Sequence, residues 1–149
     1  SDDYGKNWKF IANNIPSSPV NVIKEDPKNE DVLYVGTDNG LYVSLNRGKS
    51  WEAFAKNLPN VAVHDLVIQP KAKHLVIGTH GRSIYRADIS TIQEMTSKIL
   101  EKDQHVFAIP NTRYSSSLGR SRSQWRPAST PSVSVPFYVK KGGAVNVSV

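Results

Sequence analysis

One octapeptide pattern occurs twice in this chain, at residues 1–8 and again 43 positions later at residues 44–51. Both copies read Ser-x-[Asp/Asn]-x-Gly-x-x-Trp. The flanking sequence repeats as well, because Asn-Ile-Pro at 14–16 returns as Asn-Leu-Pro at 57–59, and Gly-Thr at 36–37 returns at 78–79. A period of about 40–45 residues with strand-like content is typical of propeller blades. The sequence therefore predicts tandem sheet units.

The octapeptide itself predicts a tight hairpin turn. Asp3 is expected to accept hydrogen bonds from backbone N–H groups two or three residues on, and Ser1 to add a weaker local bond. Gly5 is expected to adopt the left-handed conformation, and Trp8 to begin the outgoing strand and bury its ring. Asn46 can make the same bonds as Asp3 without the charge. The eight residues assigned this structural role are Ser1, Asp3, Gly5, Trp8, Ser44, Asn46, Gly48 and Trp51.

The doubled octapeptide resembles the Asp-box, or BNR, repeat. That family includes sialidases, xyloglucanase-type glycoside hydrolases, sortilin-like VPS10 propellers and many bacterial surface proteins. The resemblance covers residues 1 to about 89. It implies that the box joins the third and fourth strands of a blade at the rim, away from the central substrate-binding face. The box residues are therefore expected to support folding rather than catalysis.

The resemblance and the strand patterns together predict an all-β fold with a partial β-propeller at residues 1–89. Residues 1–15 are expected to end one blade, 19–56 to form a full blade, and 61–89 to form the last blade. The expected strands are residues 8–12, 20–23, 31–37, 41–44, 51–54, 63–68, 74–79 and 83–87. No Asp-box follows the last blade. Its fourth strand is expected to come from the remainder of the propeller, in the same polypeptide or another chain.

The rest of the chain changes character. Residues 90–103 predict a short helix, with Ser90 as N-cap and Gln93 completing a capping box. Its apolar face is expected to hold Ile92, Met95, Ile99 and Leu100. Residues 104–135 read as an irregular Ser/Arg/Pro-rich basic linker. Residues 136–149 read as the first hairpin of a β-sandwich-like domain, with strands at 136–139 and 144–149 flanking 140–143.

The order of motifs near the end of the chain carries a second resemblance. Gly-Thr-His-Gly-Arg at 78–82 lies within the expected last blade, and His-Val-Phe at 105–107 follows the expected helix. This order resembles the C-terminal third of large secreted VPS10/BNR-type propeller proteins, which are common in Bacteroidetes-like bacteria. The resemblance implies a bacterial protein that is secreted or held at the cell surface. No stretch of sequence has the roughly 20 apolar residues of a membrane span.

The net positive charge of the chain is confined to its last third. Residues 1–103 contain thirteen Lys and Arg residues and thirteen Asp and Glu residues. Residues 104–149 contain six basic residues and no acidic one, so this tail carries the whole net charge of +6. Arg120, Arg122 and Arg126 could therefore meet an acidic partner, anionic lipid or a polysaccharide. The alternative is a linker that is solvated or that lies along an acidic part of the same protein.

Few residues offer catalytic chemistry. Sialidases of this fold hold a carboxylate with three arginines. Only Arg82 and Arg86 lie close together in this sequence, which argues against a sialidase site. Arg82 and His80 are kept as possible binding residues. His64 and Asp65 are adjacent in a strand and so point to opposite faces. Glycoside hydrolysis needs two carboxylates, and neither Asp38 nor Asp65 matches a catalytic position of the family. No metal site, cofactor or nucleic-acid module is expected.

The sequence thus favours a non-catalytic binding or scaffolding region of a secreted or cell-surface β-propeller. Its expected partners are the rest of the propeller and other surface proteins or polysaccharide. The alternative is part of a glycoside hydrolase whose catalytic carboxylates lie in blades outside these residues.

Overall fold

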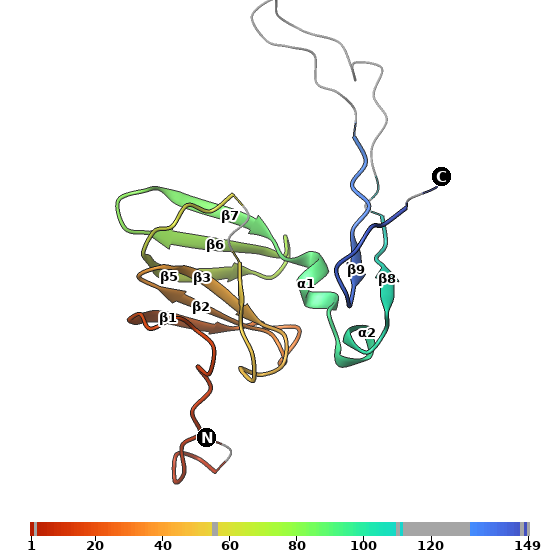
Figure 1. Ribbon diagram of the computed structural model, residues 1–149. Coiled ribbons are helices and arrows are strands. Elements are labelled where there is room, and N and C mark those ends of the chain that lie inside the picture. The colour runs from red at the N-terminus through yellow and green to blue at the C-terminus, as the bar shows by residue number, and fades with distance from the viewer. Residues whose placement is uncertain (2, 55–56, 110, 112–131, 147, 149) are drawn as a thin grey trace, which may run out of the picture. The chain divides into compact units, whose positions relative to one another are not determined.

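The computed structural model describes residues 1, 3–54, 57–109, 111, 132–146 and 148 of the 149-residue chain (Figure 1). The chain divides into two compact units, Ser1–Lys98 and Ile99–Val149. Strands dominate the first unit, the second contains two short strands, and the helices of the described residues are short. The predicted all-β character is therefore confirmed for the described residues.

The first unit contains a four-stranded antiparallel sheet. Its strands follow chain order, as β1 (Val20–Glu25), β2 (Leu33–Thr37), β3 (Gly40–Ser44) and β4 (Glu52–Ala53). β-Branched and aromatic residues at β2 favour this pairing, and the turn between β2 and β3 is closed by the Thr37 hydroxyl, which donates to the carbonyl of Gly40. These strands lie within or beside the four predicted for residues 19–56.

A second antiparallel sheet repeats this order with one strand fewer. It contains β5 (Val63–Gln69), β6 (His74–Thr79) and β7 (Ile84–Asp88). The pairing of β1 with β2 shifts register between Val20 and Val22, and the pairing of β5 with β6 shifts between Val63 and Asp65. The irregularity thus recurs at equivalent positions, 43 residues apart. The two sheets are structural copies as well as sequence copies.

The two sheets bury one hydrophobic core between them. Its fully buried members include Tyr34 and Leu41 from the first sheet and Val63, Leu66 and Leu75 from the second. β5 packs against β1 and β2. Gly36 permits this approach, because a Cβ at that position would lie 2.6 Å from Cγ1 of Val63.

Two short helices follow β7, α1 (Ser90–Glu94) and α2 (Ser97–Leu100). The prediction of one helix over residues 90–103 with Ser90 as a side-chain N-cap was wrong. The Ser90 N–H instead donates to the Asp88 carboxylate, 2.8 Å away. The Asn29 side-chain amide binds the carbonyls of Gln93 and Met95, and Met95 leaves the helical region with ψ of 87°. These carbonyl contacts explain why α1 ends after little more than one turn.

The second unit contains a two-stranded sheet of β8 (Gln104–Val106) and β9 (Phe137–Val139). The predicted hairpin of 136–139 with 144–149 was wrong, because β9 pairs antiparallel with β8 and residues 144–146 and 148 are not in a strand. In this pairing the Tyr138 hydroxyl donates to the carbonyl of Leu100. The Phe107 N–H donates to the carbonyl of Pro136 and extends the pairing by one more backbone bond. Most of the predicted linker at 104–135 lies outside the described residues.

None of the helices in the described ranges is both long and apolar enough to cross a bilayer.

Candidate functional site

The first box turn is held by two side chains that accept backbone hydrogen bonds. The Ser1 hydroxyl accepts from the N–H of Gly5 at 2.7 Å, and the Asp3 carboxylate accepts from the N–H of Asn7 at 2.9 Å. Each acceptor side chain therefore binds the backbone N–H four residues further along the chain, whereas the sequence predicted a donor two or three residues from Asp3. Ser1 also donates to Asp3, which fixes both acceptors in one geometry.

The second box turn repeats the same bonds with asparagine in place of aspartate. The Ser44 hydroxyl accepts from the N–H of Gly48 at 2.8 Å, and the Asn46 side-chain oxygen accepts from the N–H of Ser50 at 2.9 Å. Ser44 also donates to Asn46. The prediction that an uncharged amide can serve this turn is confirmed.

Both turns also share a left-handed backbone at their centre. Tyr4 and Gly5 have φ of 57° and 85°, and Arg47 and Gly48 have φ of 58° and 80°. Glycine reaches this region without the steric cost that a Cβ imposes. The expected conformation of the box glycine is confirmed in both copies.

The two box tryptophans differ in their surroundings. Trp51 is only 3 % exposed, its indole N–H donates to the carbonyl of Ile11 at 2.6 Å, and its backbone N–H and carbonyl are both bound by the side-chain amide of Asn14. Trp8 is 83 % exposed and residues 8–12 form no strand. The predicted strand at residues 8–12 and the predicted burial of the Trp8 ring were therefore wrong.

We expect Asn46→Asp to change the free energy of unfolding by less than about 0.5 kcal/mol, the range of most surface substitutions. Asp3 already fills the equivalent position in the first copy and accepts the same backbone bond. Chemical denaturation at neutral pH is the measurement. A loss above about 2 kcal/mol would mean that the amide nitrogen, which donates to Ser50, is essential to the turn.

The Asp3 carboxyl should titrate well below the usual aspartate range. Hydrogen bonds from the backbone and side chain of Asn7, and from Ser1, lower the pKa of Asp3 to about 2. A depressed folded-state pKa means that the turn is stabilised above the unfolded pKa of 3.8, and that this contribution is lost as the pH falls through about 2. An NMR titration of the Asp3 carboxyl carbon with a midpoint near 4 would contradict this.

A second group of polar residues lies where the hairpins of the two sheets meet the starts of β1 and β5. The Asp38 N–H donates to the carbonyl of Pro19 at 3.2 Å, and the His80 N–H donates to the carbonyl of Ala62 at 2.9 Å. These two backbone bonds occupy equivalent places in the two repeats. The β2–β3 and β6–β7 hairpins are therefore held in the same way at one edge of the sheets, which we call the hairpin edge.

The hairpin edge carries different side-chain pairs in the two repeats. Asn21 donates to the Asp38 carboxylate at 2.8 Å and to the carbonyl of Val63 at 3.2 Å. In the second repeat His64 and His80 take these two places, with their ring centroids 5.3 Å apart and tilted by 46°. All four side chains are exposed. The sequence singled out Asp38, His64 and His80, but Asn21 and the two pairings only emerged from the fold.

Arg82 belongs to the hairpin edge without joining either pair. It lies exposed in the β6–β7 hairpin between Gly81 and Ser83, which both have positive φ. No salt bridge joins it to another described residue. In the described ranges no group of three or more His, Cys, Asp or Glu residues could hold a metal ion. Arg120, Arg122 and Arg126 lie outside the described residues.

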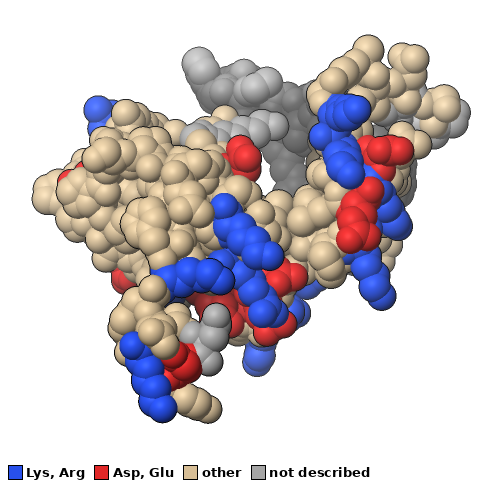
Figure 2. Space-filling view, turned by 60° about the horizontal axis from the view of Figure 1, so that its bottom comes forward, with Lys and Arg blue, Asp and Glu red and all other residues tan. Residues whose placement is uncertain are grey.

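Charged side chains of both signs are interspersed on the face shown in Figure 2. In the first unit Arg47 of the second box turn binds Asp31 at 2.8 Å and also pairs with Glu30, and these carboxylates raise the pKa of its guanidinium. These side chains are largely exposed, so the pairs contribute little to stability.

A buried polar network joins α1 to the loop between β1 and β2. The Asp26 carboxylate, only 2 % exposed, accepts bonds from the Gln93 amide and from the Tyr34 hydroxyl. Burial, together with the negative charge of Asp26, raises the pKa of Tyr34. The sequence analysis missed this network, since its members lie up to 67 positions apart. Its function is to attach the helix after β7 to the first sheet.

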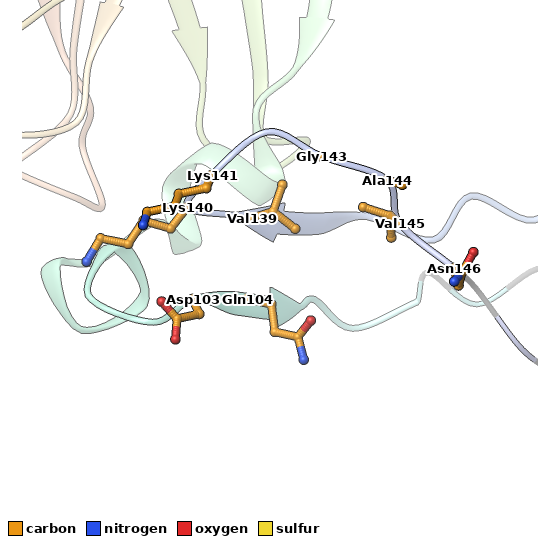
Figure 3. Close-up of a pocket in the computed structure, with 9 residues that line it drawn as sticks. All are labelled: Asp103, Gln104, Val139, Lys140, Lys141, Gly143, Ala144, Val145 and Asn146. Carbon is orange, nitrogen blue, oxygen red and sulfur yellow. The ribbon is translucent and has the colours of Figure 1, made fainter.

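The second unit contains a shallow cavity of about 370 Å³ beside β8 and β9 (Figure 3). Asp103 precedes β8 and Gln104 begins it, and Lys140 and Lys141 follow the end of β9. The Lys140 ammonium donates to the carbonyl of Glu101 at 3.5 Å.

Comparisons of the chain with protein-family models, with curated proteins and with solved structures gave no significant match.

Proposed function

We propose that residues 1–89 form part of an Asp-box β-propeller, with the end of one blade, one full blade and the closing blade. The support comes from four features that recur along the chain, at spacings of 42 or 43 residues where single positions can be compared. These are the box bonds, the antiparallel strand order, the register shift in the first strand pair and the backbone bond that holds each hairpin. Recurrence of all four favours a tandem array over two unrelated sheets.

The proposed function is non-catalytic binding or scaffolding by a secreted or cell-surface bacterial protein. The hairpin edge is the observation that carries it. The two repeats hold their hairpins with the same backbone bond, yet one presents the Asn21–Asp38 pair and the other the His64–His80 pair. Loops whose side chains differ while the supporting strands stay the same are the usual place for binding residues. The expected ligands are surface polysaccharides or other surface proteins.

The acids of this edge are engaged in local hydrogen bonds. Asp38 accepts from Asn21, and Asp65 accepts from the N–H of Leu66 at 2.8 Å. Glycoside hydrolysis requires two carboxylates that flank the same bond. Each of these aspartates already accepts a local hydrogen bond, which favours binding over hydrolysis by these residues.

The natural polypeptide that contains this chain should be tested on an array of surface polysaccharides, both for retention and for release of reducing sugar. We expect retention without hydrolysis, and a drop in affinity of about tenfold in the variant Asp38→Ala/His64→Ala/His80→Ala, as for the loss of one or two good contacts. Trp8→Ala is the matched control. Hydrolysis that disappears in Asp38→Asn or Asp65→Asn would replace this proposal with a glycosidase.

A further inference from the structure

The first unit contains an occupied site for an extended strand. Residues 11–15 receive the strand that leaves the second box turn. The indole N–H of Trp51 donates to the Ile11 carbonyl, and the Asn14 side chain binds both the N–H and the carbonyl of Trp51. On its other side the same strand pairs with β3, through Tyr42 opposite Ala53 and Val43 opposite Glu52. The strand is therefore held between a segment of loop and a sheet edge.

The residues that form this site recur 43 positions later. Ile11, Asn14 and Ile15 return as Phe54, Asn57 and Leu58. These three line a pocket of about 280 Å³ together with Tyr85, Arg86 and Ala87 of β7. The β7 residues stand at the positions that Tyr42, Val43 and Ser44 hold in β3. The pocket is thus lined by residues at positions equivalent to both sides of the Trp51 site.

The second site has no strand in the described part of the chain. β7 is the last strand of its sheet, and β6 is its one neighbour there. The position equivalent to Trp51 is Glu94, which belongs to α1. Asn57 makes no side-chain hydrogen bond to a described residue, whereas Asn14 makes two. The loop and sheet edge that received a strand in the first repeat are therefore repeated without their strand.

The charge of Arg86 indicates which kind of partner strand fits beside β7. β4 places Glu52 opposite Val43, and β7 carries Arg86 in the place of Val43. Directly opposed residues of opposite charge stabilise a strand pair, and like charges destabilise it. The other two tryptophans of this chain are each followed by a basic residue, Lys9 after Trp8 and Arg126 after Trp125. Neither would suit the position opposite Arg86.

We infer that β7, together with Phe54, Asn57 and Leu58, binds an extended partner strand in which an aromatic residue is followed directly by an acidic one. This inference rests on the proposed repeat architecture and names the chemistry of its missing strand. The aromatic ring enters the pocket, an indole N–H would donate to the Phe54 carbonyl, and the Asn57 amide binds the backbone of that residue. The acidic side chain pairs with Arg86. The partner strand comes from outside these 149 residues.

The test uses a fluorescent peptide with the sequence of residues 44–56, which carries Trp-Glu, and the 149-residue chain. Anisotropy should show saturable binding. The Trp51→Ala peptide should bind about 30-fold more weakly, as for loss of a central aromatic anchor. The Glu52→Lys peptide should bind roughly 5- to 10-fold more weakly, since an opposed pair becomes a repulsive one.

Variants of the chain make the test specific to the pocket. Asn57→Ala should weaken binding of the Trp-Glu peptide about tenfold, as for loss of two backbone hydrogen bonds, whereas the exposed Asn13→Ala should not. Arg86→Glu should reverse the preference, so that the Glu52→Lys peptide binds more tightly than the original. Circular dichroism of each variant separates a lost site from a lost fold.

Four results would overturn the inference, three of them from the peptide experiment. These are the absence of saturable binding, equal affinity for all three peptides, and an unchanged preference in Arg86→Glu. Self-association of the chain that is abolished by Trp8→Ala and that competes with the peptide would also overturn it, because a second copy would then be the occupant. The box turns are tested separately by Trp51→Ala in the chain itself, so failure of the peptide experiment leaves that test of the architecture intact.

Discussion

Trp51→Ala is expected to lower the free energy of unfolding of the first unit by about 3–5 kcal/mol, the usual cost of truncating a buried aromatic residue. The indole is 3 % exposed, and its N–H is bonded to the Ile11 carbonyl. Truncation removes the packed ring and leaves that carbonyl without its donor. Urea denaturation followed by circular dichroism is the measurement, with the midpoint and the slope both recorded.

Trp8→Ala is the matched control for this substitution. Trp8 occupies the same place in the octapeptide, but it is 83 % exposed and no described sheet lies beside it. Its replacement should change the free energy of unfolding by less than about 0.5 kcal/mol. Equal effects of the two substitutions would show that burial by residues 11–14 is not what makes Trp51 important.

Gly36→Ala is expected to destabilise the first unit by about 3 kcal/mol, toward the upper end of the usual cost of overpacking. The new Cβ would lie 2.6 Å from Cγ1 of Val63, 2.7 Å from Cγ1 of Val22 and 2.9 Å from the carbonyl oxygen of Val63. The last of these atoms belongs to the backbone of β5, so relief requires the two sheets to separate. Thermal and chemical denaturation should both report the loss.

Gly78→Ala tests the same position in the second repeat. There the nearest atom to a new Cβ is the carbonyl oxygen of Asp65, at 3.5 Å, which is an ordinary contact. The substitution should therefore cost less than about 1 kcal/mol, the range for an added methyl group without a clash. A large loss at Gly78 together with a small one at Gly36 would mean that the sheets do not pack through β2 and β5 as described.

Local regularities of the sequence predicted the box turns and the strands of residues 19–89. The strand predicted at residues 74–79 is β6 with the same bounds, because alternating β-branched and apolar residues suit one half-buried strand. The box turn was predictable because all of its bonds run between residues no more than four apart. Such bonds form from local chemistry, whatever lies elsewhere in the protein.

The candidate site was less accessible from the sequence. His80 and Arg82 stood out as residue types in a hairpin, but the partners of the hairpin edge did not. Asn21 reaches Asp38 and Val63 only because β1 lies beside both β2 and β5. The repeat of Asn14 at Asn57 was visible in the sequence, and the signal that gave it meaning was the bond between Asn14 and Trp51 in the folded chain.

The sequence by itself determined the repeat, its strands and its polar turns, because each depends on side chains acting on backbone within a few residues. Tertiary structure alone decided which tryptophan is buried, that β9 pairs with β8 and that α1 stops at Glu94. Each of these depends on which distant segment supplies a surface, a free strand edge or a hydrogen-bond donor. Trp8 and Trp51 occupy the same place in the octapeptide, yet only Trp51 lies against a loop that covers it.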